Sequence, residues 1–547
     1  PSVRSLRRNA QVTVTNQMRN QFFIVSALLF ILVGVGSYLW HPIAFLFGFL
    51  VPLFLLGLAD IFQSQHTVRR NFPVIGHGRY LLEKIRPEIN QYFIESNLDG
   101  RPFSRERRSV IYQRSKNVTD TVPFGTQDDV YREGYEWINH SLIPAPLMHT
   151  DPRVRIGGDR CKQPYDASLF NISAMSYGAL SKNAILALNL GAKNRGFYHN
   201  TGEGGLSPYH QEGGGDLGWQ IGTGYFGARD KVGNFSAQEF QKRAILPQVR
   251  MIEIKLSQGA KPGHGGILPA RKVTAEIAAI RGVEIGKDVL SPPSHSAFST
   301  PIELLQFVDQ LRELSGGKPV GFKLCLGKRR EFFSICKAML ETGLLPDFIN
   351  IDGGEGGTGA APLEFSNSVG TPLNDGLIFV HNALVGLGLR KKIRVICAGK
   401  ISTGFNLASK FALGADICNS ARGMMFALGC IQALRCNSND CPTGVATQNP
   451  SLMKGLDVGN KADRVASFHK NTLHSFLEVI AAAGLKDPTE LRPWHIQRRV
   501  NSTDVKHYGE IYTYLEPGAL LGPDIPEGYR RPWKAAAAHT FDALSGP

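Results

Sequence analysis

Residues 320–359 read VGFKLCLGKRREFFSICKAMLETGLLPDFINIDGGEGGTG, and this stretch decides the fold. An apolar run at 320–324 is followed by a helical pattern at 331–341 and by a second apolar run at 348–351. A strand, a helix and a strand in this order form the repeating unit of parallel sheets. The glycine-rich segment after the second run indicates a loop at the carboxyl end of a strand, where such folds bind ligands.

The same alternation extends to both sides of this stretch. Further strand-like runs lie at 169–175, 197–200, 251–256, 288–291, 394–398 and 415–419. Helical patterns separate them at 182–194, 272–281, 302–314, 375–387 and 404–413. Eight strand–helix units over about 250 residues predict an α/β fold, a (β/α)8 TIM barrel. An open doubly wound sheet is the alternative, which is disfavoured because no GxGxxG motif opens the first helix.

The N-terminal region predicts a transmembrane hairpin of two helices. Residues 20–59 contain no Asp, Glu, Lys or Arg, and two apolar runs, 22–40 and 43–59, flank His41 and Pro42. Each run approaches the ~17–25 residues that cross a bilayer as a helix. Arginines stand before and after the hairpin, so the positive-inside rule places both ends, and the catalytic body, on the cytoplasmic side of the cytoplasmic (inner) membrane. A buried helical hairpin of a soluble core is the alternative.

These patterns suggest five regions. They are a basic N-terminal segment (1–20), the hairpin (21–60), a connector packing on the barrel (61–160), the barrel (161–485) and a C-terminal extension (486–547). The net charge is +15, but we find no basic helix with interleaved aromatics and no nucleic-acid recognition motif. We therefore expect a lipid bilayer as a partner, and no nucleic acid.

Three cysteines near the end of the barrel region predict an iron–sulfur cluster. Cys430, Cys436 and Cys441 form a C-x5-C-x4-C run followed by the turn residues Pro442 and Gly444. Three thiolates rather than four suit a cluster with three irons, or one with an open iron, and such clusters pass single electrons. Three buried structural cysteines are the alternative.

Polar residues follow several of the predicted strands. Glu203 stands among glycines after the second strand, as a candidate acid, base or ammonium binder, and Lys261 follows the third strand in a loop of small residues. Lys323 ends the fifth, otherwise apolar, strand and could stabilise a reduced flavin ring. Turns at 398–404 and 419–423 occupy the position at which barrels usually bind phosphate, which suits FMN.

Taken together, these segments resemble the synthase domain of FMN-dependent glutamate synthases. The matching stretches are 173–181, 200–205, 254–263, 291–293, 356–360 and 429–448, and the resemblance covers roughly residues 165–485. It implies a barrel that carries FMN at its mouth and a 3Fe-4S cluster held by the three cysteines. It also implies that 2-oxoglutarate is bound by Gln258, Lys261 and Arg281, with Glu203 close by. The positions that match FMN contacts are Ala174, Met175, Ser176, Gln220, Lys323, Gly354, Gly357, Gly399, Gly423 and Met424.

The resemblance implies a short reaction sequence. Electrons reach FMN through the cluster, ammonia and 2-oxoglutarate form 2-iminoglutarate, and reduced FMN delivers a hydride to the imine carbon to give L-glutamate. Glu203 and Lys261 would be the catalytic residues, and Lys261 and Arg281 would fix the substrate carboxylates.

The sequence also departs from the family pattern. We find no glutaminase domain and no nucleotide-binding fingerprint for NADPH, so we expect free ammonia and a separate electron-donor protein, ferredoxin-like or a reductase subunit. His264 and Ile267 stand where the family usually has Glu and Gln. Two alternatives therefore stay open: a flavin and iron–sulfur oxidoreductase acting on another keto acid or imine, and a non-catalytic electron-relay subunit. We also consider that copies of this chain assemble into a homo-oligomer.

Overall fold

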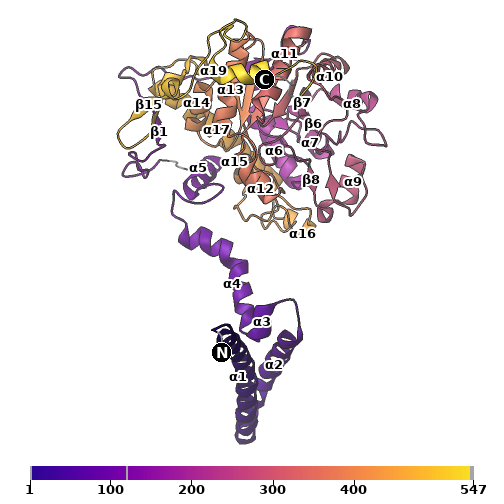
Figure 1. Cartoon of the computed structure of the whole chain (residues 1–547), viewed down its shortest axis with the longest axis vertical. Coiled ribbons are helices and arrows are strands. Elements are labelled where there is room, and N and C mark those ends of the chain that lie inside the picture. Colours follow the sequence, from indigo (N-terminus) through magenta and orange to yellow (C-terminus); the bar gives the residue numbers. More distant parts are fainter. Residues whose placement is uncertain (1–2, 119–120, 543–547) are drawn as a thin grey trace. The chain divides into compact units, whose positions relative to one another are not determined.

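The computed structural model describes residues 3–118 and 121–542, with side chains from residue 18 onward. The chain divides into two compact units, 1–96 and 97–547. The first consists of helices, and the second contains all the strands (Figure 1).

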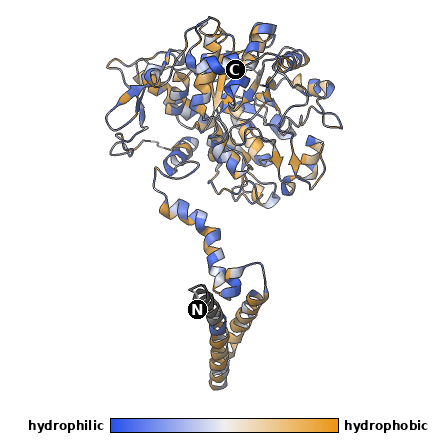
Figure 2. Cartoon of the chain, in the orientation of Figure 1, coloured by the Kyte–Doolittle hydropathy of each residue, from blue (hydrophilic) through white to orange (hydrophobic). Residues whose placement is uncertain are grey.

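The first unit begins with the two apolar helices that the sequence predicts. Its elements are α1 (Val3–Leu39), the 3-10 helix η1 (His41–Leu46), α2 (Phe47–Phe62), α3 (Thr67–Asn71), α4 (Gly76–Ile89) and the π-helix η2 (Asn90–Ile94). Two segments, Met18–Leu39 and His41–Phe62, are each 22 residues long and apolar enough to cross a membrane, and only 6% of each is buried (Figure 2). The helices meet through aromatic rings, since Phe30 packs against Phe47 and Phe54.

The second unit is built on a closed barrel of eight parallel strands, which confirms the predicted (β/α)8 architecture. In barrel order the strands are β4 (Phe170–Ile172), β5 (His199–Asn200), β6 (Leu217–Ile221), β7 (Val249–Lys255), β10 (Val320–Leu324), β11 (Phe348–Asp352), β12 (Arg394–Ala398) and β13 (Ile417–Ser420). β13 pairs with β4 and closes the barrel.

Helices surround the barrel, and several begin at a side-chain cap. They are α6 (Lys182–Arg195), α7 (Pro208–Glu212), α8 (Ala237–Ala244), α10 (Pro301–Leu314), α11 (Arg329–Thr342), α13 (Leu373–Gly386), α14 (Gly404–Ala412) and α15 (Arg422–Leu428). The hydroxyls of Ser181, Thr300 and Thr403 accept hydrogen bonds from the third residues of α6, α10 and α14. Such caps satisfy amides that have no partner inside the helix.

One predicted strand is wrong. The run at 288–291 is not in the barrel: β9 (Val289–Leu290) pairs antiparallel with β8 (Ile267–Leu268) in a small hairpin. The third barrel strand is β6, which lies between the predicted strands at 197–200 and 251–256, where no strand is predicted from the sequence. Glycines at 213–215 and at 222 flank this five-residue strand, and such clusters are typical of loops. The loop that carries Lys261 therefore follows the fourth barrel strand, β7, rather than the third.

Apolar side chains fill the barrel toward the amino ends of its strands. Tyr198, Met251, Phe348, Ile396 and Ile417 pack there against the hairpin of β2 (Arg153–Ile156) and β3 (Tyr165–Ser168). This end is closed, so the opposite end, at the carboxyl ends of the strands, is the one available to ligands.

The remaining elements lie outside the barrel. Helix α17 (Val458–Ala482) packs against α5 (Arg105–Lys116), α6 and α14. A three-stranded antiparallel sheet joins β1 (Glu136–Ile138), β14 (Ile496–Arg499) and β15 (Val505–His507). Short helices complete the unit: α9 (Ala275–Arg281), α12 (Leu363–Ser368), α16 (Pro450–Met453), α18 (Tyr508–Ile511) and α19 (Glu527–Lys534), with the 3-10 turns η3 (Ala270–Lys272), η4 (Pro488–Glu490) and η5 (Pro493–His495).

Candidate active site

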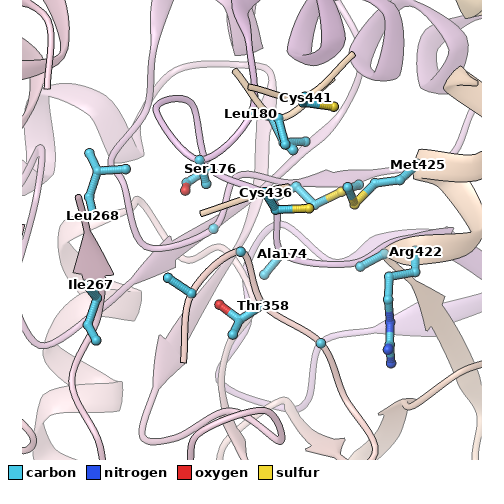
Figure 3. A pocket seen from close by; sticks show the side chains of 18 of the residues that line it. Ala174, Ser176, Leu180, Ile267, Leu268, Thr358, Arg422, Met425, Cys436 and Cys441 are labelled. Atoms are coloured by element: carbon cyan, nitrogen blue, oxygen red, sulfur yellow. The ribbon is translucent and has the colours of Figure 1, made fainter. Parts of the chain in front are cut away.

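A cavity of about 260 Å3 lies at the carboxyl ends of the barrel strands. Loops after β4, β5 and β7 contribute to its wall, together with the cysteine-bearing segment after α15. Ile267 and Leu268 lie on one side of it, and Met425, Cys436 and Cys441 on the other (Figure 3). The predicted substrate residues Glu203, Gln258, Lys261 and Arg281 all line this cavity.

Glu203 is held as a carboxylate by a lysine. Its Oε2 lies 2.6 Å from Nζ of Lys255, the last residue of β7. Burial alone would raise the pKa of Glu203, but Lys255, helped by Lys261 and Arg281, outweighs it and lowers that pKa to about 2. Glu203 is therefore ionised at neutral pH and can hold a cation or accept a proton.

Sequence reasoning missed Lys255. Its signal was present, because a lysine in the apolar run 251–256 is as unusual as Lys323 in its own strand, and the two are paired across β7 and β10. Burial lowers the pKa of Lys255, and the attraction of Glu203 opposes that shift.

Lys261 is 2% exposed and donates from Nζ to the carbonyl oxygen of Ala360, at 3.0 Å. Burial lowers the pKa of Lys261 to about 8; Glu203 opposes this shift and Lys255 adds to it. An ammonium has three donors, so two N–H groups of Lys261 are not accounted for by Ala360. Near neutral pH this lysine can bind a carboxylate or give up a proton.

Two further groups in the wall carry buried donors without a protein partner among the described residues. They are Nε2 of Gln258 and Nε of Arg281. Arg281 is otherwise well fixed, because Nη2 donates to the carbonyl oxygen of Tyr177 and the guanidinium stacks over the ring of Phe226. Burial lowers the pKa of Arg281 to about 10, so it stays cationic at neutral pH. Unpartnered buried donors are costly, which indicates that a ligand accepts from them.

His264 and Ile267, which depart from the family pattern, differ in their position relative to the cavity. Ile267, in β8, lines the cavity, whereas His264 is not part of the cavity wall and packs edge-on against the ring of Phe365. The apolar side of the cavity therefore includes Ile267, and His264 stands apart from it.

Most positions expected to contact FMN surround this cavity or a smaller one of about 50 Å3 beside it. The larger is lined by Ala174, Met175, Ser176, Gln220 and Gly357, and the smaller by Ala174, Lys323, Gly357, Gly399 and Gly423. Gly354 and Met424 line neither cavity. The amide of Gly354 donates to the carbonyl oxygen of Thr371, and Met424 is fully buried in the core.

The smaller cavity is surrounded by cations, which fits an anionic group. Lys323, Lys400 and Arg422 all line it, together with Asp352, whose Oδ2 lies 3.9 Å from Nζ of Lys323. A Cβ at Gly357 would lie 2.8 Å from Nε of Arg422, so any other residue here would have to displace the Arg422 side chain. The donor set fits the phosphate and ring of a flavin nucleotide. Arg422 was not predicted from the sequence as a site residue, because its side chain reaches the cavity only through the fold.

The three cysteines line the larger cavity together. Burial raises the pKa of Cys430 to about 12 and also raises that of Cys436. Burial acts the same way on Cys441, but hydrogen bonds from the Thr443 hydroxyl and nearby backbone amides outweigh it and lower its pKa. Within residues 3–118 and 121–542 there is no group of three His, Cys, Asp or Glu side chains placed to hold a metal ion. Three thiols on one wall nevertheless form a donor set that iron–sulfur clusters use.

Comparisons with known proteins match the part of the chain that forms the barrel. A family model described as the conserved region in glutamate synthase matches residues 151–486. The chain is 38% identical over 502 residues to the glutamate synthase large subunit-like protein YerD of Bacillus subtilis, covering 84% of this chain and 95% of that protein. It is 37% identical over 326 residues to the archaeal glutamate synthase [NADPH] of Methanocaldococcus jannaschii, covering 59% of this chain and 60% of that one.

Among solved structures, a mutant flavocytochrome b2 with bound pyruvate aligns with a TM-score of 0.41 and 13% identity, covering 77% of this chain and 89% of that one. The barrel itself is established by the strand pairing. The family match spans more than half of the chain, and a relative that aligns over almost its whole length agrees with it. The chain therefore belongs to the glutamate synthase family, a class of oxidoreductases that act on CH–NH2 groups.

Proposed function

We propose that this chain is a membrane-anchored FMN and iron–sulfur oxidoreductase that reductively aminates 2-oxoglutarate with ammonia to L-glutamate. The observation that carries the proposal is the convergence on one cavity of Glu203, Gln258, Lys261 and Arg281 with the three cysteines. Separate stretches of the chain supply these residues, and only a binding site explains why their polar atoms meet there.

The charge of the site suits a dicarboxylate. Lys261 and Arg281 are cations, and Gln258 adds a neutral donor whose Nε2 has no protein partner among the described residues. Carboxylate oxygens only accept hydrogen bonds, so each of these groups matches one. The binding of two carboxylates would fix the keto carbon between them, which lowers the entropic cost of the reaction.

The protonation states suit reductive amination. Ammonia is mostly ammonium at neutral pH; the Glu203 carboxylate can hold that cation, and the neutral fraction of Lys261 can take a proton from it to free the amine. Lys261, with a pKa of about 8, can protonate the departing hydroxyl when the adduct of ammonia and the keto acid loses water. Bound FMN would supply the hydride, and the cluster its electrons one at a time. The overall balance is one 2-oxoglutarate, one ammonia, two electrons and two protons to one glutamate and one water.

The apolar helices support membrane anchoring. Met18–Leu39 and His41–Phe62 are long enough to span a bilayer, and their side chains are exposed rather than packed in a core. The arginines around them favour a cytoplasmic catalytic unit. The electron donor would be a separate protein.

The test uses the whole chain in detergent or nanodiscs, loaded with FMN and reconstituted anaerobically with iron and sulfide. With a reduced viologen as donor, we expect L-glutamate from 2-oxoglutarate and ammonium, and flavin and iron–sulfur absorption bands that bleach on reduction. Lys261→Met is expected to lower kcat/KM for 2-oxoglutarate by about tenfold or more. A fully loaded preparation that makes no glutamate would refute the substrate assignment, and a colourless one would refute the cofactors.

A second candidate substrate is favoured by Ile267. This residue gives the cavity an apolar wall, so a 2-oxo acid or imine with an apolar side chain would also find a complementary surface. A panel of 2-oxo acids in the same assay decides between them, because preference for an apolar side chain over 2-oxoglutarate would replace the first substrate by the second.

A further inference from the structure

Glu253 is a buried carboxylate inside the barrel that the proposed reaction does not use. It lies on β7 and is 0% exposed. Its Oε1 accepts from Nδ2 of Asn200 at 2.9 Å and from Nε2 of Gln220 at 2.6 Å, and its Oε2 accepts from Nδ2 of Asn350 at 2.7 Å. Carboxamides from β5, β6 and β11 thus converge on one acid.

This arrangement is unusual because no cation is paired with the acid. Among the described residues, the hydrogen-bonding partners of the Glu253 side chain are the three carboxamides, and none of its contacts is an ion pair. Removing a charge from water is costly unless hydrogen bonds replace its hydration, and three amide donors provide that replacement. An apolar residue of similar size would fill the same space without this cost, so the retained charge indicates a role in the site.

A carboxylate fixes the direction of an amide. Since an ionised carboxylate only accepts, each amide must turn its NH2 group toward Glu253 and its oxygen away. For Asn200 the outward oxygen, Oδ1, accepts from the backbone N–H of Gly202, which is next to Glu203 in the sequence. For Gln220, which lines the larger cavity, the amide oxygen is the atom left to face a ligand.

We propose that Glu253 is a positioning residue that holds Gln220 with its amide oxygen toward the cofactor, so that the site accepts a hydrogen bond from a ring N–H of the bound flavin. The inference rests on the proposed binding of FMN. It explains why this part of the site presents a hydrogen-bond acceptor. An oxidised isoalloxazine ring has one ring N–H, between two carbonyl groups, and only an acceptor matches that atom. Through Asn200, the same carboxylate also fixes the loop that carries Glu203.

Glu253→Gln is the direct test because it keeps the shape of the side chain. The new NH2 group faces the donor of Asn350, so that amide must invert, while Asn200 and Gln220 keep only a neutral acceptor, which holds them less firmly than the carboxylate. We expect FMN to bind about tenfold more weakly, as for the loss of a hydrogen bond to a charged group. We also expect a changed flavin absorption spectrum and a more positive midpoint potential, since a buried negative charge near the reduced, anionic ring is removed.

Asp347→Asn is the matched control. Asp347 is also a buried acid in the barrel, but it lies at the closed end, where Nη2 of Arg312 is 3.0 Å from its Oδ2. This variant is expected to lower the melting temperature and to leave FMN affinity, spectrum and potential unchanged. The measurements use the full chain in detergent, with FMN removed and then titrated back, and they follow flavin fluorescence and the melting temperature with and without FMN.

The outcomes separate the inference from the proposed function. If wild-type protein binds FMN and Glu253→Gln binds it with unchanged affinity, spectrum and potential, Glu253 does not position Gln220 and the inference is overturned. If wild-type protein binds no FMN, the proposed function fails and this inference fails with it. Should Glu253→Gln not fold, Gln220→Met decides, because it removes the amide and leaves the other two donors of Glu253 in place. It is expected to reproduce the weaker FMN binding and the changed spectrum, while the potential shift caused by the charge of Glu253 stays absent, and wild-type FMN affinity and spectrum in that variant would overturn the inference.

Discussion

Each end of the barrel holds a carboxylate paired with a buried cation, but the two pairs have different surroundings. At the closed end, Oδ1 of Asp347 accepts from the amide of Gly158, and Oδ2 accepts from Arg312 and from the amide of Val320. At the open end, Glu203 has Lys255 as its ion-pair partner and faces a cavity of about 260 Å3.

The comparison shows which pair stabilises the fold and which serves a ligand. Around Asp347 the hydrogen-bonding capacity is filled by the protein, as stability requires. Around Glu203, Nε2 of Gln258 and Nε of Arg281 lack protein partners in the described residues. Hydrogen-bond donors without a partner beside an ion pair are costly for folding. They are retained where a bound molecule accepts from them.

The largest effect that this comparison predicts is on stability at the closed end. Asp347→Ala removes the main partner of Arg312, whose Nη1 keeps a hydrogen bond to Asp309. Arg312 keeps its ion pair with Asp309, but the buried pair is lost and the amides of Gly158 and Val320 lose their acceptor, so we expect the free energy of unfolding to fall by about 3 kcal/mol. Denaturant titration measures this change. Substrate affinity should stay at the wild-type value, and a parallel loss of affinity would show that the two ends are not independent.

The next effect concerns pH at the open end. Lys261 has a pKa of about 8 and is cationic below it, whereas Glu203, with a pKa of about 2, stays ionised throughout. As pH rises through 8, Lys261 loses its proton and its attraction for a dicarboxylate. We therefore expect the Kd for 2-oxoglutarate to be nearly constant between about pH 6 and 7 and to rise above about pH 8, by at most about tenfold per pH unit.

Calorimetric titration up to about pH 9 checks this profile, below the range where Arg281, with a pKa of about 10, begins to titrate. Lys261→Met should bind more weakly at low pH and lose the rise above pH 8. A variant that keeps the rise would assign the titration to another group and would remove Lys261 from the substrate contacts.

The contrast between the two ends also explains how far the sequence predicts the fold. The strands at 320–324 and 394–398 were predicted with the bounds that β10 and β12 have. β6 was missed because glycines flank it on both sides, at 213–215 and at 222, so the stretch has the composition of a loop, while the apolar run at 288–291 forms a surface hairpin instead. Apolar runs predict that a strand exists, but they do not say which sheet it joins.

The sequence predicts the site residues that lie in recognisable motifs. It does not predict the residues that reach the site because of how the strands pair. Glu203 and Lys261 stand in glycine-rich loops that attract attention in the sequence. Glu253 lies within an apolar strand, and its importance appears only when β7 pairs with β6 and brings Gln220 beside it. Which residues of separate strands meet depends on barrel closure, and that information is not local in the sequence.

The smallest expected effect tests whether a scaffold residue outside the cavity wall affects binding. Thr300 caps α10: its hydroxyl accepts from the amide of Glu303, and the Glu303 carboxylate accepts in return from the amide of Thr300. Thr300→Ala removes one half of this reciprocal cap, so the free energy of unfolding should fall by about 1 kcal/mol. Thr300→Ser keeps the hydroxyl and should stay close to the wild-type stability. Because neither residue lines the cavity, the Kd for 2-oxoglutarate should be the same in both variants. A weaker Kd in the alanine variant alone would mean that the start of α10 supports the binding loops, and the division between scaffold and site would then have to include it.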